Sequence, residues 1–324
     1  MIAVGDRDVA GLPRLVALRA LGLGDLLTGV PALRALRRAF PRHHRVLVTP
    51  AWLTPLVRLL GDAVDTMVDV DFRTRVRTLP AELHAPDVAV NLHGSGPQSR
   101  AALGALDPDW LISWRDPDAA PHAPPWRDDE HERARWCRLL AESGIPADAG
   151  DYLIDPPTDR VPAELTGVTI VHPGAAAVAR RWPVERWARV ARHLRLHGGD
   201  VLITGGAGEA GLGAQVAERA GIDPRWVVAG HTDVEELTAL VAAAGRVVCG
   251  DTGVAHLATA LATPSVVLFG PTAPARWGPP HDDRHIALWA GRTGDPHADH
   301  PDPGLLAITV DDVISALDRL RVAV

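Results

Sequence analysis

Carboxylate, arginine and histidine side chains of this chain gather in glycine-rich segments, each placed at the end of a short apolar run. Four such segments stand out: GLGDLLTGVPALRALRRAFP (22–41), HPGAAAVARRWPVERW (172–187), TGGAGEAG (204–211) and CGDTGVAHLATALATPSVVLFGPTAPARWGP (249–279). Proteins built on parallel sheets bind their ligands just past the carboxyl ends of the strands. The four segments are therefore the candidate site.

The first segment offers a carboxylate, Asp25, which follows Gly22 and Gly24 and opens a helical pattern. A carboxylate beside a hydroxyl group can take its proton during a reaction, which is general-base catalysis. The same residue can equally serve only as a helix cap. A dinucleotide fingerprint would need a third glycine where this chain has Leu27, so the segment is a weak match to that motif.

The second segment places Arg180 and Arg181 at the start of a helix. Backbone N–H groups at a helix start favour an anion, and an arginine there can hold a diphosphate in a bidentate fork. The alternative is a pair of arginines that are merely solvated.

The third segment carries a G-x-G-x-x-G pattern between an apolar run and a helical one. The next expected strand, 226–231, lacks the acidic residue that NAD binding requires, so the pattern predicts a nucleotide but not NAD. Glu209 can accept hydrogen bonds from ribose hydroxyls. Alternatively, it is only a carboxylate favoured by the helix dipole.

The fourth segment runs from an expected strand through Asp251, Thr252 and Gly253 into an alanine-rich helix that carries His256 one turn in. The start of that helix presents N–H groups and a hydroxyl to a ligand. A single histidine on such a helix is more often packed than ligating, and an aspartate there is more often a cap. The segment as a whole is more specific than any of these residues.

The elements that must position these residues alternate along the chain. Helical patterns run from Asp25 to Phe40, from Pro183 to His197, and after an expected capping box of Thr232 and Glu235. Continuous apolar runs of this kind fit strands of a parallel sheet buried on both faces, and the alternation predicts a doubly wound α/β architecture. The expected strands are 14–20, 45–50, 87–93, 168–173, 200–206, 246–251 and 265–270.

The alternation breaks over 115–165, where Asp, Pro and Arg accumulate. We place a domain boundary near 155–167, which gives two domains, 1–160 and 161–324, each of ordinary size. The amphipathic segment 310–320 is expected to pack back on the first domain.

The composition argues against several kinds of partner and of binding site. The net charge of −7 provides no bulk attraction to nucleic acid or to an anionic membrane. Two cysteines are too few for a disulfide framework or a cysteine-based zinc site. The His-rich stretches 281–285 and 297–303 match no standard metal spacing. Neither a signal peptide nor a transmembrane run is recognised, so we expect a cytoplasmic protein that meets any membrane-bound acceptor peripherally.

Taken together and in this order, the four segments resemble glycosyltransferase family 9, typified by enzymes that add heptose from ADP-heptose to the lipopolysaccharide inner core. The resemblance extends from the strand at 14–20 to about residue 318. It implies a GT-B fold, in which two Rossmann-like domains face each other across a cleft, the first binding the acceptor and the second the donor. It also implies an inverting transfer that needs neither a metal nor another cofactor.

The resemblance also assigns roles to residues. Asp25 matches the catalytic base, Arg180 stands where the family usually carries a phosphate-binding lysine, and Glu209 matches a contact to the donor ribose. Base and phosphate site would come from opposite domains, because inversion needs the base on the face away from the leaving diphosphate. The donor-binding loop matches Asp251, Thr252, Gly253 and His256, and the acceptor side includes Gly24 and His93.

The expected function is transfer of a sugar, with heptose from ADP-heptose leading, to a hydroxyl of a glycan, glycolipid or small molecule. Ala175 and Ala176 stand where relatives often place Ser or Thr, which loses hydroxyl contacts to phosphate. One alternative is therefore a glycosyltransferase of the same fold that uses another nucleoside-diphosphate sugar for a secondary metabolite or a cell-surface glycan. A second is a non-catalytic nucleotide-sugar-binding protein, in which Asp25 only caps its helix.

Overall fold

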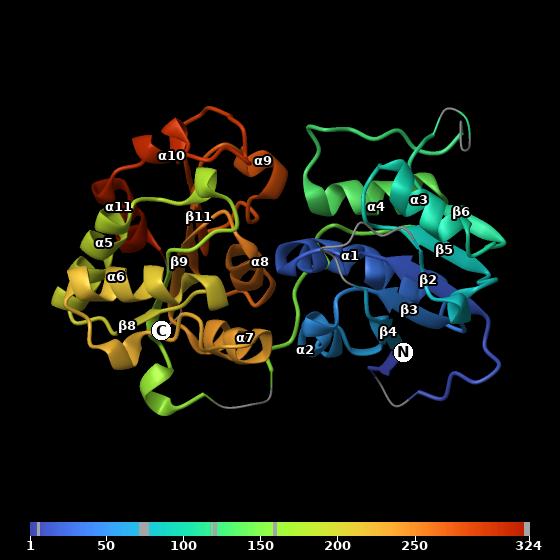
Figure 1. Cartoon of the computed structure of the whole chain (residues 1–324), viewed down its shortest axis with the longest axis horizontal. Coiled ribbons are helices and arrows are strands. Elements are labelled where there is room, and N and C mark those ends of the chain that lie inside the picture. Colours follow the sequence, from blue (N-terminus) through green and yellow to red (C-terminus); the bar gives the residue numbers. More distant parts are fainter. Residues whose placement is uncertain (5–6, 71–77, 117, 119–121, 158–160, 321–324) are drawn as a thin grey trace. The chain divides into compact units, whose positions relative to one another are not determined.

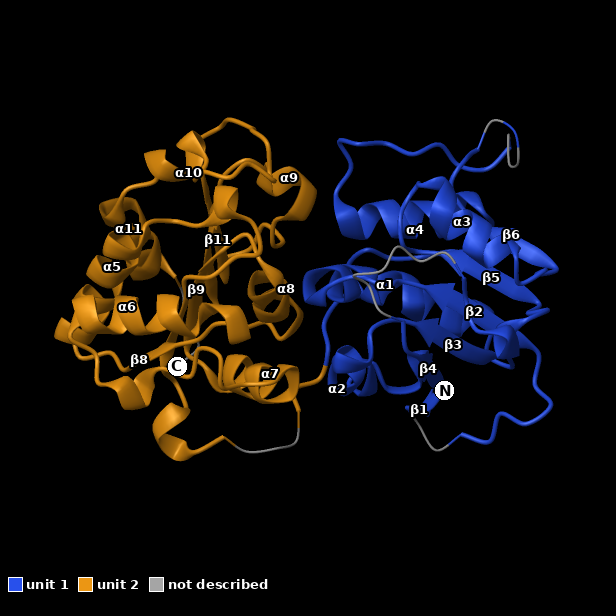
Figure 2. Cartoon of the chain, in the orientation of Figure 1, with its two compact units in different colours: residues 1–154 blue, residues 155–324 orange. Residues whose placement is uncertain are grey.

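The computed structural model describes residues 1–4, 7–70, 78–116, 118, 122–157 and 161–320. The chain divides into two compact units, residues 1–154 and 155–324 (Figure 2), where the sequence had placed the division after residue 160. Each unit has its own sheet and its own apolar core. The expected doubly wound α/β architecture is confirmed in both.

The sheet of the first unit has the strand order β1-β4-β3-β2-β5-β6. Neighbouring strands are parallel, except that β1 pairs antiparallel with β4, which the sequence did not predict. The central strands are buried along their whole length, as their continuous apolar runs predicted. The strands are β1 (Ile2–Ala3), β2 (Arg14–Leu18), β3 (His44–Val48), β4 (Thr66–Val68), β5 (Val88–Asn91) and β6 (Trp110–Ile112).

Helix α1 (Leu23–Ala39) follows β2 after a short turn, and Gly22 is its N-cap. Asp25 is therefore not the N-cap residue itself, but its side chain caps the helix start from the third helical position. Asp25 lies in the first turn of the helix, and its carboxylate accepts a hydrogen bond from the Gly22 N–H at 3.2 Å. This bond satisfies one of the backbone donors that a helix start leaves open.

A further helix, α4 (Glu132–Glu142), lies in the charged stretch 115–165, where we had expected the alternation of strands and helices to break. It packs against α1 and buries one face, which includes Trp136, Leu139 and Leu140. The many charges hid this helix, because its mean hydropathy is low although its apolar residues keep helical spacing. The other helices of this unit are α2 (Thr54–Arg58) and α3 (Pro97–Gly104).

The sheet of the second unit is parallel throughout, with the order β11-β10-β9-β7-β8. Residues 226–231, expected as a strand, form only an isolated bridge from Val227 to Ile203. The strands are β7 (Thr169–His172), β8 (Val201–Ile203), β9 (Arg246–Gly250), β10 (Ser265–Phe269) and β11 (His285–Trp289).

Helices cover both faces of this second sheet, with α5, α6 and α11 on one face and α7 and α8 on the other (Figure 1). The capping box of α7 is Asp233 with Glu236, one residue beyond the predicted Thr232 with Glu235. The helices are α5 (Val184–Leu196), α6 (Ala210–Ala220), α7 (Val234–Ala243), α8 (Gly253–Ala260), α9 (Pro274–Trp277), α10 (Pro303–Ala307) and α11 (Val310–Arg319).

Helix α11 belongs to the second unit. Its apolar face, with Val313, Ala316 and Leu317, joins the core of that unit and packs against α5, β10 and β11. The expectation that this face packs back on the first domain is wrong. Among the described residues, no helix is both long and apolar enough to cross a membrane.

Candidate functional site

The strand order of each sheet reverses at one place. In the first unit the chain moves outward from β2 to β3 and β4, then returns to pair β5 on the other side of β2. In the second it moves from β7 to β8, then returns to place β9 on the other side of β7. Such reversals open a crevice at the carboxyl ends of the strands, where α/β proteins bind ligands. The predicted site residues follow the strands at these two places.

Asp25 lies half-buried just past β2. Burial raises the pKa of its carboxyl group, the nearby Arg19 guanidinium lowers that pKa, and the Glu132 carboxylate raises it again. A carboxylate whose pKa is raised by burial accepts a proton more readily than an exposed aspartate does. Asp25 therefore has the environment of a general base.

His93 lies just past β5, the strand next to β2, and its backbone N–H donates to the Asn91 side chain at 3.1 Å. Burial, reinforced by the Arg19 charge, lowers the pKa of His93 to about 4. Its buried Nδ1 has no hydrogen-bond partner within the described residues. His93 is thus a neutral imidazole near neutral pH. Gly24, also predicted for the acceptor side, lies in the first turn of α1.

Arg180 ends the 3-10 helix Val178–Arg180, and its Nη1 donates to the backbone oxygen of Asp251 at 3.2 Å. The Nε atom of Arg180 is buried without a partner in the described part of the chain. A Cβ on Gly250 would lie 3.3 Å from the Arg180 oxygen, so a glycine suits this close approach of the two segments. The structure thus brings the predicted arginine to the end of β9.

Asp251 is buried, and burial raises the pKa of its carboxyl group to about 6, although the Arg180 charge acts to lower it. Thr252 is the N-cap of α8, and its side chain makes no capping bond to the helix. Gly253 begins the helix, so N–H groups remain at this end. His256, one turn further, is half-buried and meets the Trp277 ring edge-on at 5.6 Å, as a packed histidine would.

Glu209 ends a 3-10 helix after β8, and its Oε2 accepts a hydrogen bond from the Gly206 N–H at 2.8 Å. The buried His172 at the end of β7 lies with Nε2 3.9 Å from that oxygen, while its Nδ1 is 2.9 Å from the Thr204 hydroxyl. The Glu209 carboxylate also sits against Gly174, which has no room for a Cβ. Glu209 is therefore held by its own turn and by the segment that ends β7 and follows it.

Sequence reasoning missed three of these groups. Arg19 stands in the apolar run RLVALRA, where a single charge among buried positions was the available signal. His172 was part of a quoted motif, but nothing local predicts its contact with Glu209. Glu132 lies within the charged stretch 115–165, where we predicted no helix.

The sequence matches a known protein family. The model of "Glycosyltransferase family 9 (heptosyltransferase)" matches residues 121–303, more than half of the chain. The chain belongs to glycosyltransferase family 9.

Within family 9, the chain is 33% identical over 158 residues to lipopolysaccharide heptosyltransferase 2 of Escherichia coli K12. That match covers 46% of this chain and 45% of the relative, so it spans about half of either protein. Lipopolysaccharide heptosyltransferase 1 of Pseudomonas aeruginosa is 27% identical over 297 residues, which covers 82% of this chain and 81% of that protein.

A solved structure of the E. coli ADP-heptose LPS heptosyltransferase II superimposes with a TM-score of 0.74 at 21% identity, covering 95% of this chain and 98% of that one. This likeness confirms the predicted GT-B architecture of two Rossmann-like units. The family 9 match includes Arg180, Glu209 and the loop at 251–256, whereas Asp25, Gly24 and His93 precede its first residue.

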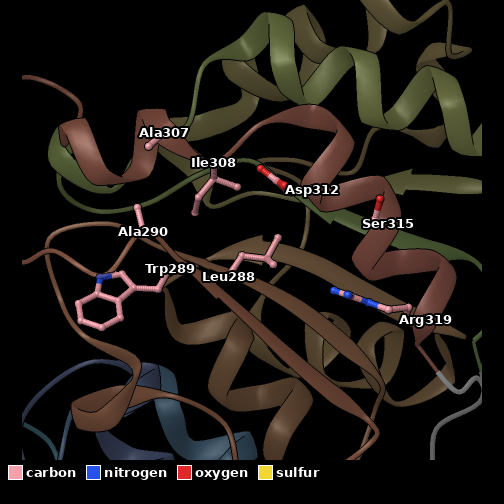
Figure 3. Close-up of a pocket in the computed structure, with 8 residues that line it drawn as sticks. All are labelled: Leu288, Trp289, Ala290, Ala307, Ile308, Asp312, Ser315 and Arg319. Carbon is pink, nitrogen blue, oxygen red and sulfur yellow. The ribbon is translucent and has the colours of Figure 1, made fainter.

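A pocket of about 310 Å³ lies in the second unit between the edge strand β11, α10 and α11 (Figure 3). None of the predicted site residues lines it. The Asp312 carboxylate is engaged by the Thr309 N–H and hydroxyl at 2.8 and 2.7 Å. The pocket therefore offers less chemistry than the two strand reversals. Its lining is Leu288, Trp289, Ala290, Ala307, Ile308, Asp312, Ser315 and Arg319.

Proposed function

We propose that this family 9 protein is an inverting glycosyltransferase that moves heptose from ADP-heptose to a hydroxyl acceptor without a metal ion or other cofactor. The observation that carries the proposal is the half-buried Asp25 carboxylate, whose pKa is raised by burial, at the strand reversal of the first unit. The names of the relatives in E. coli and P. aeruginosa support heptose as the sugar and lipopolysaccharide as the acceptor class. ADP as the nucleotide is supported by the name of the E. coli structure.

In the proposed reaction the acceptor hydroxyl loses its proton to the Asp25 carboxylate while its oxygen attacks the anomeric carbon of heptose. The bond from that carbon to the diphosphate oxygen breaks, and ADP leaves with the electron pair. Attack from the face opposite the diphosphate inverts the anomeric configuration. Proton transfer to a positioned base typically contributes about 10²- to 10⁴-fold to such a rate.

The second unit is proposed to bind the donor. Arg180 and the N–H groups at the start of α8 would hold the diphosphate and stabilise the charge that develops as it leaves. Glu209, held by Gly206 and His172, would accept hydrogen bonds from the ribose hydroxyls. Thr252 would add a hydroxyl at the same helix start.

The test is a transfer assay on the full chain with ADP-heptose, a lipopolysaccharide core that lacks heptose, and EDTA. We expect ADP release and a product of inverted anomeric configuration. Asp25→Asn should lower kcat by about 10²- to 10⁴-fold while donor binding by calorimetry is retained.

Asp62→Asn is the matched control, because this carboxylate of the same unit is 66% exposed and pairs with Arg37 at the surface. Unchanged turnover in Asp25→Asn would remove Asp25 as the base. Loss of turnover in EDTA that added metal restores would refute the metal-independent mechanism.

A second candidate keeps this chemistry with another nucleoside-diphosphate sugar. The observation behind it is the pair Ala175 and Ala176, which offer no hydroxyl, while the Ala175 oxygen is engaged by Arg181 Nε at 2.8 Å. Calorimetric titration against ADP, UDP, GDP and dTDP separates the two candidates. Preference for a nucleotide other than ADP would favour this second one.

A further inference from the structure

Arg19 is a fully buried charge directly after β2. A buried charge is costly unless it is paired and hydrogen-bonded, and Arg19 meets that condition on several sides. Its Nε donates to the backbone oxygen of Asp25 and its Nη1 to that of Leu92. Its Nη2 donates to the Thr28 hydroxyl at 2.9 Å and lies 3.5 Å from the Glu132 carboxylate. One guanidinium thus joins the segment that carries Asp25 to the segment that carries His93.

Glu132 is held in turn by its own helix. Its carboxylate accepts from Trp136 Nε1 at 2.9 Å and pairs with Arg135, and the Trp136 ring lies beside the Arg19 guanidinium at 4.8 Å. All of these side chains except Asp25 are buried. Two arginines and Glu132 leave one positive charge, which an ionised Asp25 would balance. The cluster is neutral as a whole when Asp25 is ready to accept a proton.

We propose that Arg19 and Glu132 are positioning residues for Asp25: Arg19 fixes the Asp25 and Leu92 carbonyls in one arrangement, and Glu132 holds Arg19 in place. The inference rests on the proposed function of Asp25 as the base. It adds two residues, one of them on α4, that do not touch the substrate. Removing either residue should alter both the position of Asp25 and the pH at which it ionises.

The two residues act on Asp25 with opposite sign. Burial raises the pKa of Asp25, Arg19 lowers it and Glu132 raises it. The charged groups of the described residues that act on Asp25 are Arg19 from the end of β2 and Glu132 from α4, and Glu132 itself pairs with Arg135. His93, from the end of β5, is neutral because its pKa is about 4. Removing Glu132 should therefore lower the pKa of Asp25, and removing Arg19 should raise it.

The experiment measures kcat/KM against pH for Glu132→Gln and Arg19→Gln in the full chain, with the donor and acceptor of the transfer assay. The rate falls on the acid side as Asp25 takes up a proton. We expect that limb to move to lower pH in Glu132→Gln and to higher pH in Arg19→Gln, each by about one unit, as for the loss of one nearby charge. Glu142→Gln, at the other end of α4 and 38% exposed, is the matched control and should leave the limb in place.

The ¹³C carboxyl resonance of Asp25, assigned by its loss in Asp25→Asn, gives the same titration without turnover. If no acceptor is glycosylated but this resonance shifts in opposite directions in the two variants, the proposed function fails and the coupling stands. No shift, or shifts of the same sign, would overturn the inference whether or not transfer occurs.

Arg19→Lys provides the test if Arg19→Gln does not fold. Lysine keeps the positive charge but cannot reproduce the planar fork of donors. We expect the acid limb to stay in place while kcat falls by about 100-fold, the cost of roughly 1 Å of misplacement. A normal kcat in Arg19→Lys would show that positioning by the fork is not needed.

Discussion

Asp251 lends itself to a quantitative test because its carboxyl group is buried at the end of β9 with its pKa raised from 3.8 to about 6. The folded state holds this proton more tightly than the unfolded state does. The free energy of unfolding should therefore fall as the pH rises from 3.8 to about 6, and level off above that. A difference of about two pKa units corresponds to about 3 kcal/mol of stability lost by ionisation at pH 8.

Asp251→Asn removes the ionisation and keeps the shape. The free energy of unfolding of the variant, relative to that of the wild type, should rise by up to about 3 kcal/mol from pH 4 to pH 8. About half of this rise should be reached by pH 5. Urea unfolding of both proteins at pH 4, 5 and 8 measures the difference. The amide contributes its own hydrogen bonds at every pH, so the change with pH, rather than the absolute difference, is the diagnostic quantity.

Glu235→Gln is the matched control for this series, because Glu235 is an exposed carboxylate on α7 of the same unit. Surface substitutions of this kind usually change stability by no more than about 0.5 kcal/mol. The reasoning fails if the stability difference between Asp251→Asn and the wild type is the same at pH 4 and pH 8. In that case the carboxylate would be as well solvated or paired in the folded chain as in the unfolded one.

Two further predictions concern the second unit. Gly174→Ala places a methyl group on the Glu209 carboxylate and should displace it, so donor KM should rise about 10-fold, the equivalent of one hydrogen bond of about 1.4 kcal/mol, with little change in melting temperature. Gly208→Ala, where a Cβ would meet open space, is its control, and equal KM values in the two variants would contradict the argument. Trp187→Ala removes a ring that is 1% exposed and packs at 5.0 Å from Trp182. It should cost about 3–5 kcal/mol in urea unfolding, and a loss below 1 kcal/mol would mean that the core closes over the gap.

The sequence predicted the longer buried strands, because continuous apolar runs such as VLV in β3 and VVLF in β10 leave few alternatives. It missed β1, β4 and β6, which have only two or three residues each. It also missed β11 at the edge of its sheet, where buried and more exposed positions alternate over only five residues. The one-residue error at α7 arose because Thr232 and Asp233 are both good caps, and only the backbone conformation decides between them.

The site was predicted as far as local motifs extend. Asp25, Arg180 and Asp251 each follow a strand, and the strand order brings them to the reversals of their sheets. Their partners could not be predicted in the same way. The contact of Arg19 with Glu132 joins residues 113 positions apart, and packing rather than any short pattern creates it.

That same separation constrains the order in which the chain can fold during its synthesis. Strand β2 pairs with β5 about seventy residues later in the chain, and Arg19 meets Glu132, the larger of the two negative charges acting on it, only once α4 exists. A nascent chain that ends before Glu132 would have to bury Arg19 without that counter-charge, which is unfavourable. The first unit can therefore complete its core around Arg19 only after the ribosome has passed α4. Domains generally fold as units. The buried pair therefore delays the folding of this unit until α4, its last helix, has been synthesised.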